Sequence, residues 1–428
     1  MFRSSLLVTV FALFTQGIGF IKLLLVAQYF GVSVELDAYY LSLVIPTLLL
    51  GFVVGALQTG FMPVYGSFIA HGDYEKAKSF RSAVLWLIVV ISITFCFLLS
   101  QVSPYLMELL IAEGTPEVKK HATDIFQIVV YILALNATAD YFALILNTHK
   151  QFLFAASAPL FNVVVSTVFL FMFQNIGALA LVYGLLLGLI VQTAIVLVVL
   201  VRNNLGFQFR CLFLTPELHR AWQLTLPILV GVALTNANFS IDQVMANMAG
   251  EGAVSILGYA SRFHNVVTQA GIIGISTVLL PTLIRLVAQG ALSEAFHLMY
   301  KLFIIVFFVS AFVVLLIFSV GDDILTKLVV RGSFTHDNAL QVFEVWGYYT
   351  LGLFPMACGI FYAKLYQALQ LPGLITRLAI VSFVLNIGLN WVLVNLFGVS
   401  GIAMATSLVY TIVTFLFYVI SKKRWKDA

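Results

Sequence analysis

The chain of 428 residues is 62% hydrophobic and only 9% charged, with a mean hydropathy of +1.06 and a net charge of +4. Water-soluble domains contain about 45–50% apolar and about 25% charged residues, so this composition excludes a soluble globular fold and requires lipid as the main solvent. The three dispersed cysteines predict neither a disulfide framework nor a metal site, and no hydrophilic stretch is long enough for a catalytic, nucleotide-binding or nucleic-acid-binding domain.

Twelve apolar segments follow one another along the chain, each near the length of about 20 residues that crosses a bilayer. They cover residues 6–30, 38–66, 83–104, 122–146, 152–173, 177–201, 221–247, 253–284, 298–320, 341–368, 373–396 and 399–421. The first is longer than the apolar part of a signal peptide and lacks a small-residue cleavage site, so we interpret it as a membrane span. The predicted fold class is therefore an all-α polytopic membrane protein.

Lysine and arginine residues concentrate in the loops on one side of these spans. Fifteen of the 22 fall on the side of the N-terminus, four fall on the opposite side, and three lie inside spans. Because basic loops remain in the cytoplasm, this bias predicts that both termini are cytoplasmic.

The chain shows a weak internal repeat. Residues 61–77 (FMPVYGSFIAHGDYEKA) and 279–295 (LLPTLIRLVAQGALSEA) share a proline, a glycine and an alanine at the same spacing. Chance similarity between apolar segments is the alternative explanation. Six spans separate the two copies, and an even number predicts a parallel repeat of two six-helix lobes around a central cavity. We expect an N-terminal lobe (1–201), a cytoplasmic linker (202–220) and a C-terminal lobe (221–428) with a short basic tail.

Two cations lie deep inside predicted spans, one in each half. Lys22 and Arg262 are eight and nine residues from the outer ends of their spans, which corresponds to depths of about 12–14 Å. Such groups are costly in lipid and usually face a cavity or a partner. Together they suit an anionic headgroup, since the arginine fork binds two phosphate oxygens. The alternative is a local carboxylate partner or extension of the side chain toward water.

A polar cluster in the C-terminal half contains the mid-span acid Asp242. Asn386 and Asn390 are one helical turn apart, and Thr406 follows in the last span. Carboxylate, amide, hydroxyl and carbonyl oxygens are ligands that an alkali cation prefers, but the same residue types also form ordinary hydrogen bonds between membrane helices. A second mid-span acid, Asp140, predicts either an ion pair or a coupling proton.

Several of these stretches resemble one known family. GFIKLLLVAQYFGVSVELDAYYLSLVIPTLLL (19–50) and GALQTGFMPV (55–64) resemble the N-terminal signature of the MurJ/MviN-type lipid II flippases, within the multidrug/oligosaccharidyl-lipid/polysaccharide exporter superfamily. LGYASRFHNVVTQAGIIGISTVLLPTL (257–283) is similar to the family's Tyr-Ala-Asp-Arg-Leu segment and the Leu-Pro beyond it. Residues 146–162 and 384–408 also fit, so the resemblance extends over nearly the whole chain.

The resemblance implies a transporter rather than an enzyme. It would flip an undecaprenyl-diphosphate-linked glycan across the bacterial cytoplasmic (inner) membrane, with Na⁺ or H⁺ as the coupling ion. The implied substrate-binding residues are Lys22, Arg262, Asp37 and Gln16, and the implied sodium-site residues are Asp242, Asn386, Asn390, Ile402 (through its carbonyl) and Thr406. The implied partners are the lipid-linked glycan, the bilayer and envelope-synthesis proteins, with no nucleic acid.

The chain also departs from the family pattern. Gln16 replaces an arginine, Leu23 and Ser261 replace aspartates beside the two cations, and Asn390 replaces an acid. These changes leave open whether the glycan is a lipid II-type peptidoglycan precursor or a surface-polysaccharide repeat unit. Two other functions also remain open: a multidrug/cation antiporter of the same superfamily, and a non-transporting scaffold of an envelope-synthesis complex.

Overall fold

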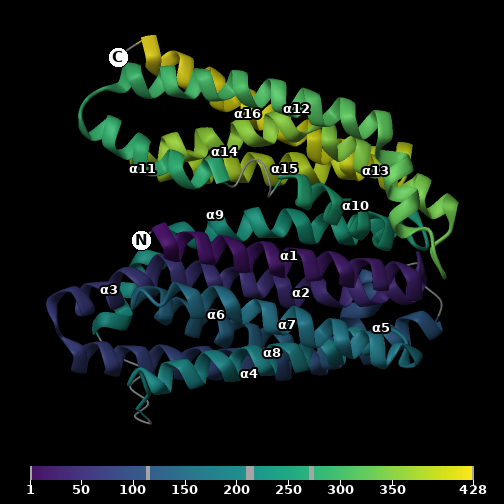
Figure 1. The fold of residues 1–428 in the computed structure, drawn as a ribbon, viewed down its shortest axis with the longest axis horizontal. Coiled ribbons are helices and arrows are strands. Elements are labelled where there is room, and N and C mark those ends of the chain that lie inside the picture. The colour runs from purple at the N-terminus through teal and green to yellow at the C-terminus, as the bar shows by residue number, and fades with distance from the viewer. Residues whose placement is uncertain (1, 112–115, 209–215, 269–273, 427–428) are drawn as a thin grey trace. The chain divides into compact units, whose positions relative to one another are not determined.

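The computed structural model of the chain describes residues 2–111, 116–208, 216–268 and 274–426 (Figure 1). Within these residues the chain is helical nearly throughout, and its only extended pairing is an isolated bridge between Arg331 and Phe334. Nine helical segments of the described chain are long and apolar enough to cross a membrane. The all-α polytopic class predicted from the sequence is therefore confirmed, while the count of twelve spans stays a prediction.

The described chain packs as two compact units. The first unit comprises Met1–Phe30 and Val34–Asn236, and the second comprises Gly31–Ser33 and Ala237–Ala428. The sequence predicts lobes that meet in a linker at 202–220, whereas the packing divides after Asn236, inside a helix. Each unit is described by itself below.

The first unit is a bundle of long apolar helices. They are α1 (Phe2–Phe30), α2 (Val34–Ala56), the π-helical segment η1 (Leu57–Phe61), α3 (Met62–His71), α4 (Tyr74–Leu110), α5 (Pro116–Val129), α6 (Ile132–Thr148), α7 (Phe152–Met172), α8 (Leu179–Arg202) and the first part of α9 (Pro216–Ala246). α7 packs along both α1 and α8, and α6 packs against α8 (Figure 1). Its core is aromatic, because Phe61 stacks on Tyr65 and Phe80 and meets Tyr141 edge-on.

The second unit contains the rest of α9 and seven further helices. These are α10 (Ala253–Thr268), α11 (Gly274–Ala288), α12 (Leu292–Val329), α13 (His336–Leu351), α14 (Leu353–Ala368), α15 (Pro372–Phe397) and α16 (Val399–Lys426). α16 packs along α13, α14 and α15, and α10 packs on α13. The predicted continuous span 341–368 consists of two helices that divide at Gly352. Of span 253–284, the structure describes α10 and α11, and residues 269–273 lie outside the described chain.

The turn of residues 31–33 joins two helices of the first unit but belongs to the second unit. Tyr259 Oη donates to the carbonyl of Gly31 at 2.9 Å, and Ser255 Oγ donates to the carbonyl of Ser33 at 3.3 Å. Gly31 has a φ of 56°, and a Cβ atom there would overlap the Ser333 carbonyl. A glycine is therefore required both by the backbone conformation and by the lack of space.

Residues 203–208, the first part of the predicted linker, are held against the end of the first unit. The guanidinium of Arg81 donates to the carbonyl of Gly206 and to Tyr65 Oη, and it lies 5.5 Å from the centroid of the Phe207 ring. The backbone N–H of Gln208 donates to Ser82 Oγ at 2.8 Å. The sequence places Arg81 in a cytoplasmic loop, whereas the structure buries it to 3% exposure inside α4.

Candidate functional site

The polar cluster predicted around Asp242 is assembled inside the second unit. Asp242 is 6% exposed on α9, and one of its oxygens, Oδ1, accepts hydrogen bonds from the amides of Asn386 at 3.1 Å and Asn390 at 2.6 Å. Its other oxygen, Oδ2, accepts from Thr406 Oγ1 at 3.4 Å. Three helices far apart in sequence therefore converge on one buried carboxylate.

The local structure of α15 and α16 explains this convergence. Asn386 and Asn390 are four residues apart and therefore share one face of α15. α16 turns back after Gly398, whose φ is 59°, and packs along α15. A Cβ atom at Gly401 would overlap the Leu393 carbonyl, so a glycine permits the close approach that brings α16 against the asparagines.

The same cluster contains oxygens suited to a monovalent cation. Asn390 Oδ1 is buried and accepts no hydrogen bond from the described residues. The fully buried carbonyl of Ile402 is 3.0 Å from Thr406 Oγ1, so it lies beside the cluster. Among the described residues, no lysine or arginine forms an ion pair with Asp242. One negative charge among neutral oxygens is a donor set that fits an alkali cation.

Two further amide oxygens lie on α9 close to Asp242. Asn238 is one turn before it and Gln243 is its neighbour, and the side-chain oxygen of each is buried without a hydrogen-bond partner in the described chain. A buried acceptor without a donor is costly, so the Asn390 oxygen, whose amide nitrogen donates to Asp242, indicates a site that a positive charge would complete. Asn238 and Gln243 belong to the polar stretch that the sequence shows around Asp242, but only the structure distinguishes their oxygens.

Lys22 lies in the first unit, on α1. Its Nζ donates to Ser166 Oγ on α7 at 3.1 Å, and its side chain is partly exposed. Lys22 is eight residues from the end of α1 at Phe30, a distance of about 12 Å along the helix. Ser166 was not predicted, because a contact across 144 residues leaves no pattern in the sequence.

The other two residues proposed for the substrate in the first unit have different surroundings. Gln16 is exposed on α1, six residues before Lys22, whereas Asp37 is 5% exposed in the first turn of α2. An acid in the first turn is favoured by the partial positive charge of the helix N-terminus, so Asp37 is placed to stabilise the start of α2. Its neighbour Glu35 accepts a hydrogen bond from the backbone N–H of Ala178, before α8.

Arg262 is exposed on α10 in the second unit, nine residues from the start of that helix at Ala253. This separation corresponds to about 14 Å along the axis. His264 is 7% exposed and its ring centroid lies 5.4 Å from that of Tyr349, so it packs in the interior of the second unit. Lys22 and Arg262 belong to different units, and their joint action on one ligand stays a prediction.

Comparison with known proteins gives consistent results. The model of the family described as "Lipid II flippase MurJ" matches residues 26–427. The "Probable lipid II flippase MurJ" of Thermotoga maritima is 29% identical over 423 residues, which cover 96% of this chain and 83% of that protein. A protein of the same description from Rhizobium meliloti is 28% identical over 347 residues, 78% of this chain. This match spans 64% of the length of the Rhizobium protein.

Solved structures show the same fold. A structure titled "Lipid II flippase MurJ, inward closed conformation" superposes with a TM-score of 0.84 at 23% identity, covering 98% of this chain and 87% of that one. An inward-facing multidrug resistance transporter of the MATE family superposes with a TM-score of 0.82 at 14% identity, covering 96% and 95%. At these identities the superpositions establish the fold, while the family model covers nearly the entire sequence. The chain therefore belongs to the lipid II flippase MurJ family.

Proposed function

We propose that this protein flips an undecaprenyl-diphosphate-linked glycan, of the lipid II type or a surface-polysaccharide repeat unit, across a bacterial cytoplasmic membrane. Membership of the MurJ family and the names of the curated relatives support this activity. The two units would expose the site alternately to the two sides of the membrane.

The observation that carries this proposal is an exposed guanidinium deep along an apolar helix. Arg262 is about 14 Å from the start of α10, and most of the other residues of that helix are buried. A cation exposed to hydrocarbon at such a depth would be strongly unfavourable, so Arg262 is expected to line a water-filled cavity. Its planar fork suits a diphosphate.

Lys22 would supply the second positive charge from the first unit. Ser166, which accepts a hydrogen bond from its ammonium group, is itself uncharged. Gln16, on the same helix, would offer neutral hydrogen bonds to the glycan or the phosphates. Asp37 would orient the start of α2 near this region rather than bind an anion directly, since a carboxylate repels phosphate.

We further propose that the Asp242 cluster holds the coupling ion, Na⁺ or H⁺. Asp242, Asn390, Thr406 and the Ile402 carbonyl would supply the oxygens, and Asn386 would keep the carboxylate oriented. A bound cation would neutralise the buried carboxylate and satisfy the orphaned Asn390 oxygen. This fit supports a sodium site more directly than a proton site, because a proton satisfies only one oxygen.

The flipping proposal is tested with purified protein in vesicles that contain a fluorescent lipid-linked glycan. Arg262→Ala should strongly reduce flipping while leaving membrane insertion normal, because the diphosphate loses its bidentate partner. Arg285→Ala, which removes an equally exposed arginine near the end of α11, is the matched control and should flip normally. Undiminished flipping by Arg262→Ala would disprove the role assigned to this residue.

A multidrug/cation antiporter is the second candidate function. The buried Asp242 cluster favours it, because a carboxylate that exchanges a metal cation for an organic cation needs no cationic partner in the cavity. The similarity to a MATE transporter shows that the fold is compatible with this function. Uptake of an organic cation by the same vesicles, with no flipping of the lipid-linked glycan, would select this function over the first.

A further inference from the structure

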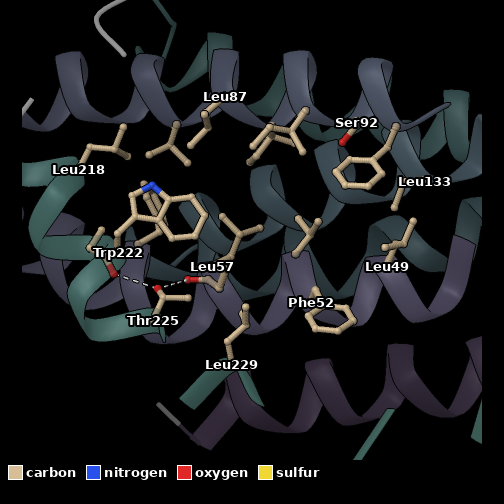
Figure 2. A pocket seen from close by; sticks show the side chains of 18 residues that line it. Leu49, Phe52, Leu57, Leu87, Ser92, Leu133, Leu218, Trp222, Thr225 and Leu229 are labelled. Carbon is tan, nitrogen blue, oxygen red and sulfur yellow. Dashed lines mark hydrogen bonds between the residues drawn. The ribbon is translucent and has the colours of Figure 1, made fainter. Parts of the chain in front are cut away.

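An elongated apolar cavity of about 440 Å³ lies inside the first unit, between α2, η1, α4 and the first part of α9 (Figure 2). None of the 18 residues that line it is charged. Figure 2 shows Leu218 and Trp222 at one end and Leu49, Phe52 and Leu133 at the other. The cavity plays no part in the function proposed above.

The lining offers very little to a polar ligand. Its two hydroxyl groups belong to Thr225, which donates to the Ala221 carbonyl at 2.9 Å, and to Ser92, which has no partner in the described chain. A sugar, a phosphate or a headgroup would lose its hydration here and could regain only the Ser92 hydroxyl and the Trp222 indole N–H as partners, at a large cost in free energy. The cavity therefore selects a purely apolar ligand.

The cavity has the length of one leaflet of a bilayer. Its lining runs along α4 from Val84 to Phe95 and along α9 from Leu218 to Leu229, which corresponds to about 16 Å at the rise of an α-helix. The hydrocarbon core of a bilayer is about 30 Å thick, so one leaflet contributes about half of that. The predicted spans 83–104 and 221–247 place these residues in the cytoplasmic half of the membrane.

The rim of the cavity is open to an apolar ligand. Trp222 is 40% exposed and Phe95 is 42% exposed, although both also line the cavity. Phe95 lies on a face of α4 where Leu98 and Val102 are also exposed, as expected of a helix surface that contacts lipid. A lipid chain can therefore enter from the bilayer without passing through water.

The floor of the cavity is closed by a close contact between η1 and α9. A Cβ atom on Gly60 would be 2.7 Å from the Ala221 carbonyl and would overlap the Thr225 hydroxyl. The π-helical turn directs Leu57 and Phe61, both buried, into the lining. Single π-helical turns are rare and occur frequently at binding sites, so the distorted backbone independently points to a ligand here.

We propose that this cavity binds one fatty acyl chain of a bilayer phospholipid, extended along α4 and α9, with its headgroup at the membrane surface. A single unbranched chain matches the leaflet length, the narrow shape and the uncharged lining. A polyprenyl chain is methyl-branched and several times longer than one leaflet, so most of it would remain outside. A bound acyl chain would fill the cavity and would act as a spacer between α4 and α9.

The test uses the full-length protein in detergent with phosphatidylglycerol that carries a diazirine in the middle of one acyl chain. After irradiation, mass spectrometry should locate the adducts on lining residues of α2, α4 and α9. Ala56→Phe, which fills the cavity, should lower the adduct yield severalfold at these residues. Ala194→Phe, the same substitution at an exposed position of α8, is the matched control and should retain the adducts.

Two further measurements complete the test. Ser92→Leu fills the other end of the cavity and replaces Ala56→Phe if that variant does not fold. Unlabelled phosphatidylglycerol should compete with the probe better than undecaprenyl phosphate does. Adducts confined to the outer surfaces of helices, or stronger competition by the polyprenyl lipid, would overturn the proposal. Because no step measures flipping, the result does not depend on the proposed function.

Discussion

Asp242 is a single buried residue that links three helices of the second unit through hydrogen bonds. A carboxylate buried to this extent is unfavourable unless hydrogen bonds or a nearby cation stabilise it, and the three donors around it supply only the first of these. Its side chain also links α9 to α15 and α16. A bound cation would neutralise the buried carboxylate. It would also coordinate the buried oxygen that has no hydrogen-bond partner.

The cation site is tested by thermal unfolding of the protein in detergent. Na⁺ should stabilise the wild type relative to choline at equal ionic strength, by about 2.7 kcal/mol when Na⁺ exceeds its Kd a hundredfold. Asp242→Asn preserves the size of the side chain but removes its charge, so it should abolish this response. Asp323→Asn, at an exposed position on α12, should keep it. A wild type that does not respond to Na⁺ would contradict the site.

His149, in the first unit, predicts that the stability of the fold depends on pH. Burial and, secondarily, the neighbouring Arg81 lower the pKa of His149 from its usual value of 6.5. Tyr65 Oη accepts a hydrogen bond from Arg81 and forms a second hydrogen bond, of 2.9 Å, with His149 Nε2. Protonation of His149 would place a second cation close to the guanidinium of Arg81.

The folded protein should therefore lose stability as the pH falls below 6.5, because the unfolded chain binds the proton more readily. Thermal unfolding between about pH 8 and about pH 5 measures this slope. His149→Asn should flatten it, whereas His297→Asn, which alters an exposed histidine of the second unit, should leave it unchanged. An equal slope in both variants would show that His149 does not contribute.

The sequence predicts some of these residues well and others not at all. Asn386 and Asn390 are recognisable because their four-residue spacing places two amides on one helix face. Ser166, the partner of Lys22, has no such local signal, and neither has the burial of Arg81 two residues before a predicted span. Contacts between distant helices depend on how the helices pack, which composition and periodicity do not specify.

At the scale of helices, close packing of α15 on α16 determines whether the cation site can form. Gly401→Ala would force a methyl group against the Leu393 carbonyl, so the two helices should separate. Overpacking of this kind typically costs about 1–3 kcal/mol. The melting temperature should fall, and the stabilisation by Na⁺ should weaken with it.

Gly388→Ala is the control for this prediction. Gly388 is exposed on α15, and a Cβ atom there would meet nothing within 4 Å. Alanine is the better helix former by roughly 0.5–1 kcal/mol, so this variant should be neutral or slightly more stable. A loss of stability equal to that of Gly401→Ala would show that helix packing at residue 401 is not responsible.

The helices themselves were predictable wherever one long apolar run corresponds to one helix. The predicted end of the first span at residue 30 and the start of the eighth at residue 253 coincide with the ends of α1 and α10. The span 341–368 is predicted as continuous because hydropathy averages over a window and does not detect a break at one residue such as Gly352. The π-helical segment within α2–α3 is invisible to hydropathy for the same reason.

For the whole molecule, hydropathy predicted the all-α membrane class correctly, while the lobe bounds 1–201, 202–220 and 221–428 stay a prediction. The packing units of the described chain divide after Asn236, inside α9. The division after Asn236 depends on which helices each turn of α9 contacts, and these contacts leave no pattern in the sequence. Family membership, by contrast, was accessible from the sequence, since the matching stretches extend over nearly all of it.

The turn of residues 31–33 has a mechanical consequence. The chain crosses between the two units three times, after Phe30, after Ser33 and after Asn236. Two of these crossings flank a turn whose carbonyls accept hydrogen bonds from Tyr259 and Ser255, so the turn itself is anchored to α10. The third crossing lies six residues before Asp242, within one continuous helix. We therefore expect a change in the packing of α9 before Asn236 to reach the cation site as a twist of that helix.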